Sequence, residues 1–220
     1  ISIRLVGSEM CIRDRYETLH GDDDEGANLA DMWIDNRSTT WSHEEVMNFC
    51  SALEASWPAD MDELDSCEGR TIVQGTMFHS NDGGTQIINS LWHGIPEFAN
   101  ADRVWMPSGH SEGRVASAAD EIVIDAHVVD ALDLSLGDTV HIGAGSSPVE
   151  FSIVGIGYHP LHVFMAPEGS IFPPEPGQYV VGYVSDSGMA RLTNSTIGNS
   201  NTILLDVEAV SYTHLTLPTT

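Results

Sequence analysis

The chain has 220 residues and carries 33 acidic against 8 basic side chains, with no lysine, so its formal net charge is −25. Contacts to phosphate groups need Lys and Arg, so this balance argues against a nucleic-acid partner and against an anionic lipid surface. A hydrophobic content of 41% is too high for a disordered acidic tail, and we expect a folded domain. Such acidity is typical of a salt-rich setting, and a codon bias is the alternative.

The two ends of the chain match each other at the level of DNA. Residues 10–14 (MCIRD) and 210–214 (VSYTH) can be encoded by one stretch of DNA read on opposite strands. A protein has no physical reason for such a match. We therefore expect residues 1–15 and 210–220 to be translated sequencing adaptor and leave them out of the fold. A basic arm or signal-peptide start is the alternative for the first segment, but no apolar h-region follows.

The first element with a strong local signal is a helix over residues 42–57. Ser42 and Glu45 form a capping box, and apolar residues recur at helical spacing: Val46, Phe49, Cys50 and Leu53. Cys50 and Cys67 form an even pair, which predicts a disulfide in an extracytoplasmic domain. Cys50 as an unbonded core residue on the apolar helix face is the alternative.

Strands surround this helix in the first half of the chain. Residues 28–36 predict a strand with three buried side chains, Leu29, Met32 and Ile34. Residues 61–80 predict one or two strands, interrupted near residues 68–69. The sequence NDGG at residues 81–84 is a hairpin turn signal, and a further strand over residues 85–95 follows it.

The middle of the chain predicts a β-rich section with one short helix. Its elements are a strand at 121–124, a helix at 125–132 that buries Val128, Val129 and Leu132, a turn at 137–138, and strands at 139–143 and 149–157. Gly155 and Gly157 predict a bulge or a bend. After a Pro-rich loop, a strand at 178–185, a helix from 186 and a strand at 201–209 close the chain.

This order of elements predicts an α+β fold, in detail a split βαβ sandwich with an inserted β-rich subdomain. Residues 16–97 and 178–209 would form the discontinuous α+β subdomain, and residues 98–177 the inserted one.

Reactive side chains in the sequence form no recognisable active site. His159 and His162 are closely spaced but lack the helical HExxH frame and a third ligand. Ser108, His110 and Ser111 lack a nucleophile elbow, and a chain without Lys has no P-loop. We expect most of the five Trp residues to pack in the core or on a sheet, and one or two exposed at a cleft could hold an apolar ligand: Trp33, Trp41, Trp57, Trp92 and Trp105. We expect no catalytic, cofactor or metal site.

One ordered series of motifs carries a family resemblance. A G-R element is followed by an acidic residue and an apolar strand, a short helix, a GD-T-V turn and a strand of the type FSIVGI. This series resembles the extracytoplasmic, MacB-like core domain of FtsX/MacB-type ABC transporter permeases. The residues that carry it are Gly113, Arg114, Asp120, Asp125, Gly137, Asp138 and Gly155.

The resemblance implies a membrane-anchored function without catalysis. The domain would lie on the extracytoplasmic side of the plasma membrane, between membrane helices missing from residues 16–209. A separate ATP-binding cassette subunit would hydrolyse ATP, and two permease copies would pair. The motion would act on a lipid, a peptide, a lipoprotein or a partner protein. A secreted metal-dependent hydrolase that uses His159 and His162 is one alternative, and an acidic surface assembly domain is the other.

Overall fold

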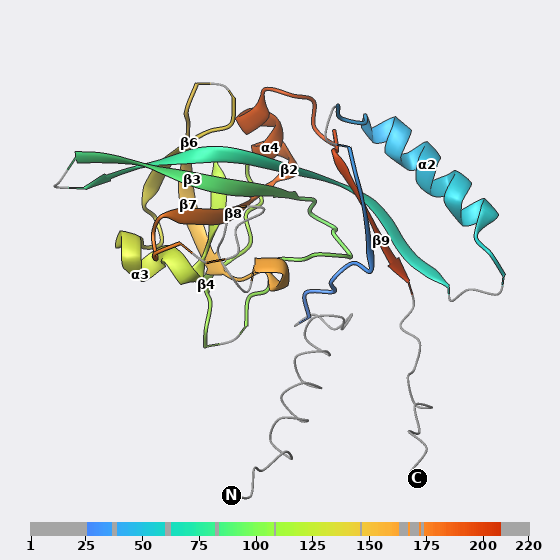
Figure 1. Ribbon diagram of the computed structural model, residues 1–220, viewed down its shortest axis with the longest axis horizontal. Coiled ribbons are helices and arrows are strands. Elements are labelled where there is room, and N and C mark those ends of the chain that lie inside the picture. Colours follow the sequence, from blue (N-terminus) through green and yellow to red (C-terminus); the bar gives the residue numbers. More distant parts are fainter. Residues whose placement is uncertain are drawn as a thin grey trace, which may run out of the picture.

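A computed structural model of the chain describes residues 26–36, 39–59, 63–81, 84–107, 109–145, 147–162, 167, 172 and 174–207. The two expected adaptor segments and Ser108 lie outside the described residues. The described part is one mixed sheet of nine strands with few helices, which confirms the α+β class (Figure 1).

One end of the sheet is formed by the two ends of the described chain. Strand β9 (Thr202–Val207) lies between β1 (Met32–Asp35) and β2 (Leu64–Asn81) and is antiparallel to both. Helix α2 (His43–Ser56) connects β1 to β2 and packs on this part of the sheet (Figure 1).

The helix begins and is attached as its sequence predicts. Ser42 and Glu45 form the capping box: the Ser42 N–H donates to Glu45 Oε2 at 2.7 Å, and the Glu45 N–H donates to Ser42 Oγ at 3.3 Å. A disulfide joins Cys50 on α2 to Cys67 on β2. Val46 and Cys50 are buried, whereas Phe49 of the same apolar series keeps 38% of its surface exposed.

Strand β2 changes its pairing partner halfway along its length. Its first half, up to Arg70, pairs with β9, and from Thr71 onward it pairs with β3 (Gly84–Ile95). The interruption expected near residues 68–69 is therefore wrong, because the backbone stays extended through all 18 residues. What changes close to that point is the neighbouring strand.

The second half of β2 belongs to a closed barrel. Its strands follow in the order β2, β3, β8, β5, β7 and β6. The barrel is closed because β6 also pairs with β2. The bounds are Tyr179–Ser185 for β8, Glu121–Asp125 for β5, Val149–Gly157 for β7 and Thr139–Gly143 for β6. A short strand, β4 (Glu112–Gly113), pairs with β7. The barrel draws strands from both sides of the boundaries predicted at residues 97 and 177.

Alternating side chains divide the barrel strands into an inner and an outer face. The inner face encloses the main hydrophobic core, with Trp92, Phe151 and Met77 fully buried in it. Helix α4 (Asp186–Thr193), the 3-10 turn η1 (Ala126–Val128) and helix α3 (Val129–Leu132) contribute Met189, Leu192, Val128 and Leu132. A smaller cluster, which includes Val123, Val181 and Tyr183, lies on the outer face.

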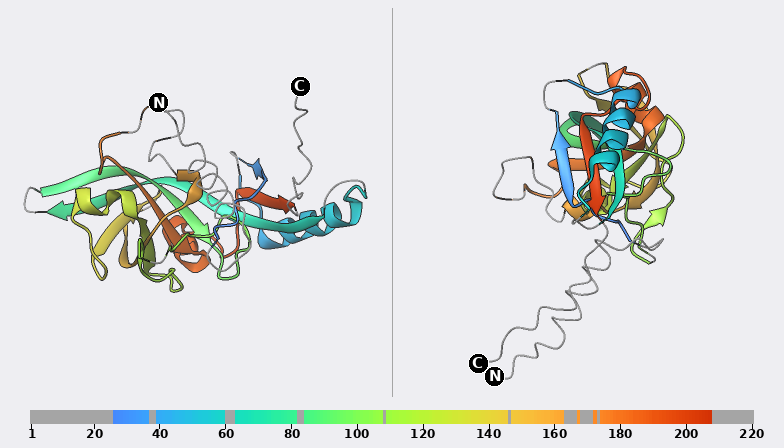
Figure 2. Two further views of the ribbon diagram at one scale, coloured as in Figure 1. Left: turned by 90° about the horizontal axis from the view of Figure 1, so that it is seen from below. Right: turned by 90° about the vertical axis from the view of Figure 1, so that its right-hand side faces the viewer.

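The burial expected for Met32 and Ile34 on the first strand is wrong, and Leu29 is half-buried. Met32, Trp33 and Ile34 keep 39%, 40% and 38% of their surfaces exposed. The reason is the position of β1, which ends the strand order and, within the part of the chain that the structure describes, pairs with β9 alone. The view in the right panel of Figure 2 places β1 at the margin of the molecule.

Candidate functional site

Three histidine side chains meet on the outer face of the barrel. His93 lies on β3, while His159 and His162 follow β7, and His162 ends the 3-10 turn η2 (Pro160–His162). Ring centroids are 5.0 Å apart for His93 and His162, 5.2 Å for His93 and His159, and 5.6 Å for His159 and His162. We call these three residues the histidine cluster. The sequence singled out only two of its members.

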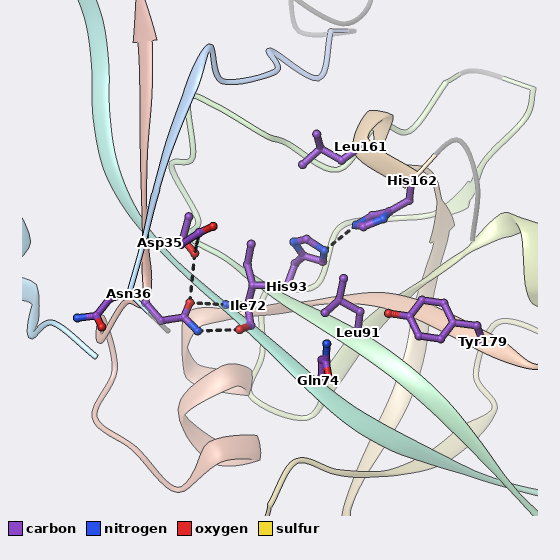
Figure 3. Close-up of a pocket in the computed structure, with 11 residues that line it drawn as sticks. Asp35, Asn36, Ile72, Gln74, Leu91, His93, Leu161, His162 and Tyr179 are labelled. Carbon is purple, nitrogen blue, oxygen red and sulfur yellow. Dashed lines mark hydrogen bonds between the residues drawn. The ribbon is translucent and has the colours of Figure 1, made fainter. Parts of the chain in front are cut away.

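His93 and His162 are joined by a direct hydrogen bond between their Nε2 atoms, 2.8 Å apart (Figure 3). One ring must accept through an unprotonated nitrogen, so at least one of the two is neutral. Burial lowers the pKa of His93 well below 6.5, and the neighbouring His159 and His162 lower it further. Burial likewise lowers the pKa of His162 to about 4. At neutral pH the pair is therefore uncharged.

His159 is held by hydrogen bonds at both ring nitrogens. Its Nε2 lies 3.2 Å from the carbonyl oxygen of Asp102, and its Nδ1 accepts from the Leu161 N–H at 3.3 Å. These partners fix the neutral tautomer that carries its proton on Nε2. Burial lowers the pKa of His159 to about 4. Since neither nitrogen is free, His159 is a packed core histidine and not a metal ligand.

A buried carboxylate extends the polar network. Asp125 ends β5 with no exposed surface; it accepts a hydrogen bond from the Tyr183 hydroxyl at 3.0 Å and lies 2.6 Å from His127 Nδ1. The Tyr183 ring stacks on His159 at 5.5 Å. Burial and Asp125 raise the pKa of Tyr183, while the hydrogen bond that His127 donates to Asp125 raises the pKa of His127. Ring stacking and hydrogen bonds thus connect the histidine cluster, through Tyr183 and Asp125, to the partly exposed His127.

A buried arginine places a positive charge next to the histidine cluster. Arg70 is 2% exposed and donates from Nη2 to Ala101 O at 2.5 Å and to Glu68 Oε1 at 3.1 Å. Its positive charge contributes to the low pKa values of His93 and His159. Asp102 accepts from the Trp33 Nε1–H at 3.0 Å, and burial raises the pKa of its carboxyl. The neutral histidines therefore lie beside a fixed positive charge.

Two members of the histidine cluster, His93 and His162, line a cavity of about 370 Å³. Figure 3 shows its lining residues, which come from five strands, the residues beside them and η2: Asp35, Asn36, Ile72, Gln74, Leu91, His93, Leu161, His162, Tyr179, Asn201 and Thr202. Part of the polar lining is already paired. The Asn201 amide exchanges two hydrogen bonds with the Ile72 backbone, and the Thr202 hydroxyl donates to Asp35 at 3.0 Å. What remains combines three aliphatic side chains, Ile72, Leu91 and Leu161, with Gln74 and the rings of the two histidines and Tyr179, and Asp35 is the acidic residue of the lining.

The hydrolase alternative depends on convergence of His159, His162 and a carboxylate. The structure brings the two rings together but directs the His159 nitrogens to the backbone. Within the described residues, no group of three or more His, Cys, Asp or Glu side chains is arranged to hold a metal ion. His110 and Ser111 lie in a turn closed by backbone hydrogen bonds to Pro107. The arrangement of His159 and His162 therefore does not supply the pair of metal ligands that the hydrolase alternative needs.

The Gly-Arg motif and the glycine bulge meet at one point on β7. Gly113 pairs with Gly155, and a Cβ atom on Gly155 would lie 2.2 Å from the Arg114 carbonyl oxygen. The Gly155 position also carries the register shift between β5 and β7, as the sequence predicted. Arg114 forms a bidentate pair with Glu121, and this hydrogen bond strongly lowers the pKa of the Glu121 carboxyl. Only glycine allows such close backbone approach.

The acidic motif residues act through local hydrogen bonds. Asp138 Oδ2 accepts from the Ser135 N–H at 2.8 Å, which closes the turn that contains Gly137 at φ 88°. The carbonyl oxygen of Asp120 accepts from the Ser152 N–H at 2.8 Å. Asp125 caps η1 through the His127 N–H at 3.1 Å. Each residue fixes a connection next to β7.

Comparisons with known proteins concern the fold. No protein-family model matches the chain, and no curated protein matches it. Among solved structures it is similar to the extracellular domain of the noncanonic ABC-type transporter YknZ from Gram-positive bacteria, at 15% identity, with a TM-score of 0.45 over 81% of this chain and 83% of that one. It is also similar to the periplasmic region of MacB from Actinobacillus actinomycetemcomitans, at 13% identity, with a TM-score of 0.46 over 81% and 76%.

A third similar structure is a domain of a permease protein from Porphyromonas gingivalis, at 15% identity, with a TM-score of 0.39 over 74% of this chain and 68% of that one. The chain is similar to extracellular and periplasmic domains of transporters and to a permease domain. In the described part of the chain, no helix has the length and apolar character needed to cross a membrane.

Proposed function

We propose that the chain is an extracytoplasmic domain of an ABC transporter permease. It passes motion, driven by ATP hydrolysis in a separate subunit, to a lipid, peptide, lipoprotein or partner protein. The permease copies pair at the plasma membrane, and the domain performs no catalysis. The observation that carries the proposal is the convergence of the motif series: its Gly-Arg element (β4), apolar strand (β5) and the strand after its GD turn (β6) all pair with β7.

The connection of the chain ends supports this proposal. Asn28 Nδ2 donates to Asp206 Oδ2 at 2.8 Å, and the Val207 N–H donates to Asp31 Oδ2 at 3.0 Å. The first and last described strands are therefore neighbours. A domain held between two membrane helices needs its entry and exit close together, so that both helices can move it as one unit.

The finer architecture belongs to the same proposal. We assign the split βαβ unit to β1, α2, the first half of β2 and β9, within the segments 16–97 and 178–209, whose other strands, β3 and β8, belong to the barrel. Residues 98–177 supply β4, β5, β6 and β7 as the inserted β-rich subdomain. Strand β2 takes part in both regions, which gives a continuous path for motion from the split βαβ unit to the barrel.

The decisive experiment recovers the DNA that flanks this coding sequence in its source. We expect an apolar run of about 20 residues within some thirty residues of each end of 16–209, and a neighbouring gene for a P-loop ATPase. Coding sequence without any such apolar run on either side contradicts the permease. An apolar run without an ATPase gene favours the acidic surface assembly domain instead.

A further inference from the structure

Strand β1 offers an unpaired edge to the outside of the molecule. It ends the strand order, and among the described residues only β9 pairs with it. The first three of its four side chains, Met32, Trp33 and Ile34, are half-exposed although they are large and apolar. An edge with these properties is a template for an added strand, because its backbone can pair and its side chains can be covered.

Two carboxylates flank this apolar centre at fixed positions. Asp31 Oδ2 accepts from the Val207 N–H at 3.0 Å, and Asp35 Oδ1 accepts from the Thr202 hydroxyl at 3.0 Å. Asp31 and Asp35 each lie two residues from Trp33, so strand alternation puts all three on one face. Nearby, burial and then the charges of Asp31 and Asp65 raise the pKa of Asp206 to about 6. The edge is therefore strongly negative.

The cavity described above begins where β1 ends. Asp35 and Asn36 line it on one side, and Leu91 and Leu161 line it on the other (Figure 3). A chain that pairs along β1 would leave the strand beside this hollow. The aliphatic lining and the Asp35 carboxylate there would meet a side chain with an apolar stem and a positive end.

Charge decides which occupant suits the edge. A second copy that paired antiparallel about Trp33 would place Asp31 opposite Asp35 of the other copy, twice. Like charges directly opposite each other destabilise a strand pair. The whole chain, with a net charge of −25, adds repulsion at longer range. A basic segment is attracted both by the carboxylates of the edge and by the net charge of the chain.

We propose that β1 is a docking edge for an extended segment of another protein, in which Arg or Lys residues flank three apolar residues. The basic side chains pair with Asp31 and Asp35, the apolar residues cover Met32, Trp33 and Ile34, and the segment continues toward the cavity. This interaction is independent of the proposed transport function.

Two seven-residue peptides with blocked ends test the proposal on the full chain. The probe is Ser-Arg-Ile-Val-Ile-Arg-Ser, and the matched control is Ser-Glu-Ile-Val-Ile-Glu-Ser. We expect the basic peptide to bind in titrations followed by amide NMR, with the largest shifts at Met32, Trp33 and Ile34. The double variant Asp31→Asn/Asp35→Asn keeps both acceptor oxygens and should weaken binding about 3- to 30-fold at low salt.

Further controls separate the edge from general charge attraction. The double variant Glu54→Gln/Asp130→Asn removes two exposed charges elsewhere and should leave the affinity within about twofold. A basic peptide with proline in place of its central Val should bind at least tenfold more weakly, because proline cannot complete the ladder. Equal binding of the acidic or proline peptide overturns the proposal, and so do shifts away from β1. Self-association through β1 that the basic peptide cannot disrupt would identify a second copy as the occupant.

Discussion

Buried titratable side chains gather on one outer face of the barrel. His93 and His159 are each 3% exposed, and Asp125 has no exposed surface. Each group is compatible with burial for a different reason: the histidines are neutral, and the carboxylate accepts hydrogen bonds from Tyr183 and His127. A change in protonation on this face therefore acts on the stability of the whole barrel.

The histidine cluster should make the protein acid-sensitive. His159 and His162 have a pKa of about 4 in the folded state against 6.5 ordinarily, so the unfolded chain binds more protons between these pH values. Stability is then complete above pH 6.5 and is lost as pH falls toward 4. The raised pKa of Asp206, about 6, opposes this in part. We expect the free energy of unfolding in urea to drop by about 2–4 kcal/mol from pH 7 to pH 5.

The variant His162→Gln tests the source of that pH dependence. It removes one titrating ring, so the difference in unfolding free energy between pH 7 and pH 5 should shrink by about a third to a half. His110→Gln changes an exposed histidine and should leave the difference as it is in the unaltered chain. An unaltered pH dependence in His162→Gln would show that the cluster is not its cause.

Asp125→Asn should disturb two partners at once. The amide keeps one acceptor oxygen, but its NH₂ group faces donors from Tyr183 or His127, so one buried donor loses its partner. We expect a loss of about 2–3 kcal/mol in unfolding free energy. The pKa of His127 should fall toward 6.5 in an NMR titration, since Asp125 raises it. Asp130→Asn, on the exposed side of α3, should change neither quantity.

At the scale of elements, α2 is attached to the sheet by apolar packing and by a disulfide. Val46 and Cys50 pack against Ile203 and Leu205 of β9, and the disulfide to Cys67 adds a covalent link to β2. The apolar contact area is small because only two helix residues are buried. The covalent link therefore contributes a large share of what holds this helix in place.

Removal of the disulfide should destabilise the protein without a change of fold. The bridge closes a loop with a sequence separation of 17, for which loop-closure entropy gives about 3 kcal/mol. We expect dithiothreitol, or the substitution of both Cys50 and Cys67 by Ser, to lower the free energy of unfolding by about 2–4 kcal/mol. Dithiothreitol should have no effect on the double Ser variant; a further loss there would mean that reduction acts elsewhere.

Elements with local signals were predictable from the sequence. The helix followed from Ser42, Glu45 and the apolar spacing, and the bulge followed from Gly155, because caps and bulges depend on residues close in sequence. The continuity of β2 and the exposure of β1 were not predictable. Both depend on which strand lies alongside, and β9 comes more than a hundred residues later.

The histidine cluster was predictable only in part for the same reason: it depends on residues that are distant in the sequence. His159 and His162 lie three residues apart in the sequence, and this spacing is enough to single them out. His93 joins them only through the register of β3 against β8, which places it beside Tyr183. Arg70, the buried charge of this face, lay in the segment predicted to be interrupted. Alternation along residues 85–95 could have placed His93 on the face opposite Trp92, but not its partners.

At the scale of the whole molecule, charge is the dominant feature. Thirty-three acidic residues and no lysine leave a net charge of −25, so the folded state carries strong self-repulsion. We expect the melting temperature to rise by about 3–6 °C from 0.1 to 1 M NaCl at pH 7, as salt screens the carboxylates. Repetition at pH 4.5 should give a smaller rise, because part of the acidic side chains are then neutral. A melting temperature that stays constant or falls with salt contradicts this origin.

The uninterrupted course of β2 has a mechanical consequence. Eighteen extended residues span roughly 60 Å along the strand, from Leu64, three residues before the disulfide at Cys67, to Asn81 at the hairpin with β3. A beam of that length amplifies rotation: a tilt of about 5° at its root carries the tip through about 5 Å, roughly the spacing of adjacent strands. Small angular displacements at the paired chain ends are thereby converted into side-chain-sized travel at the far rim of the barrel.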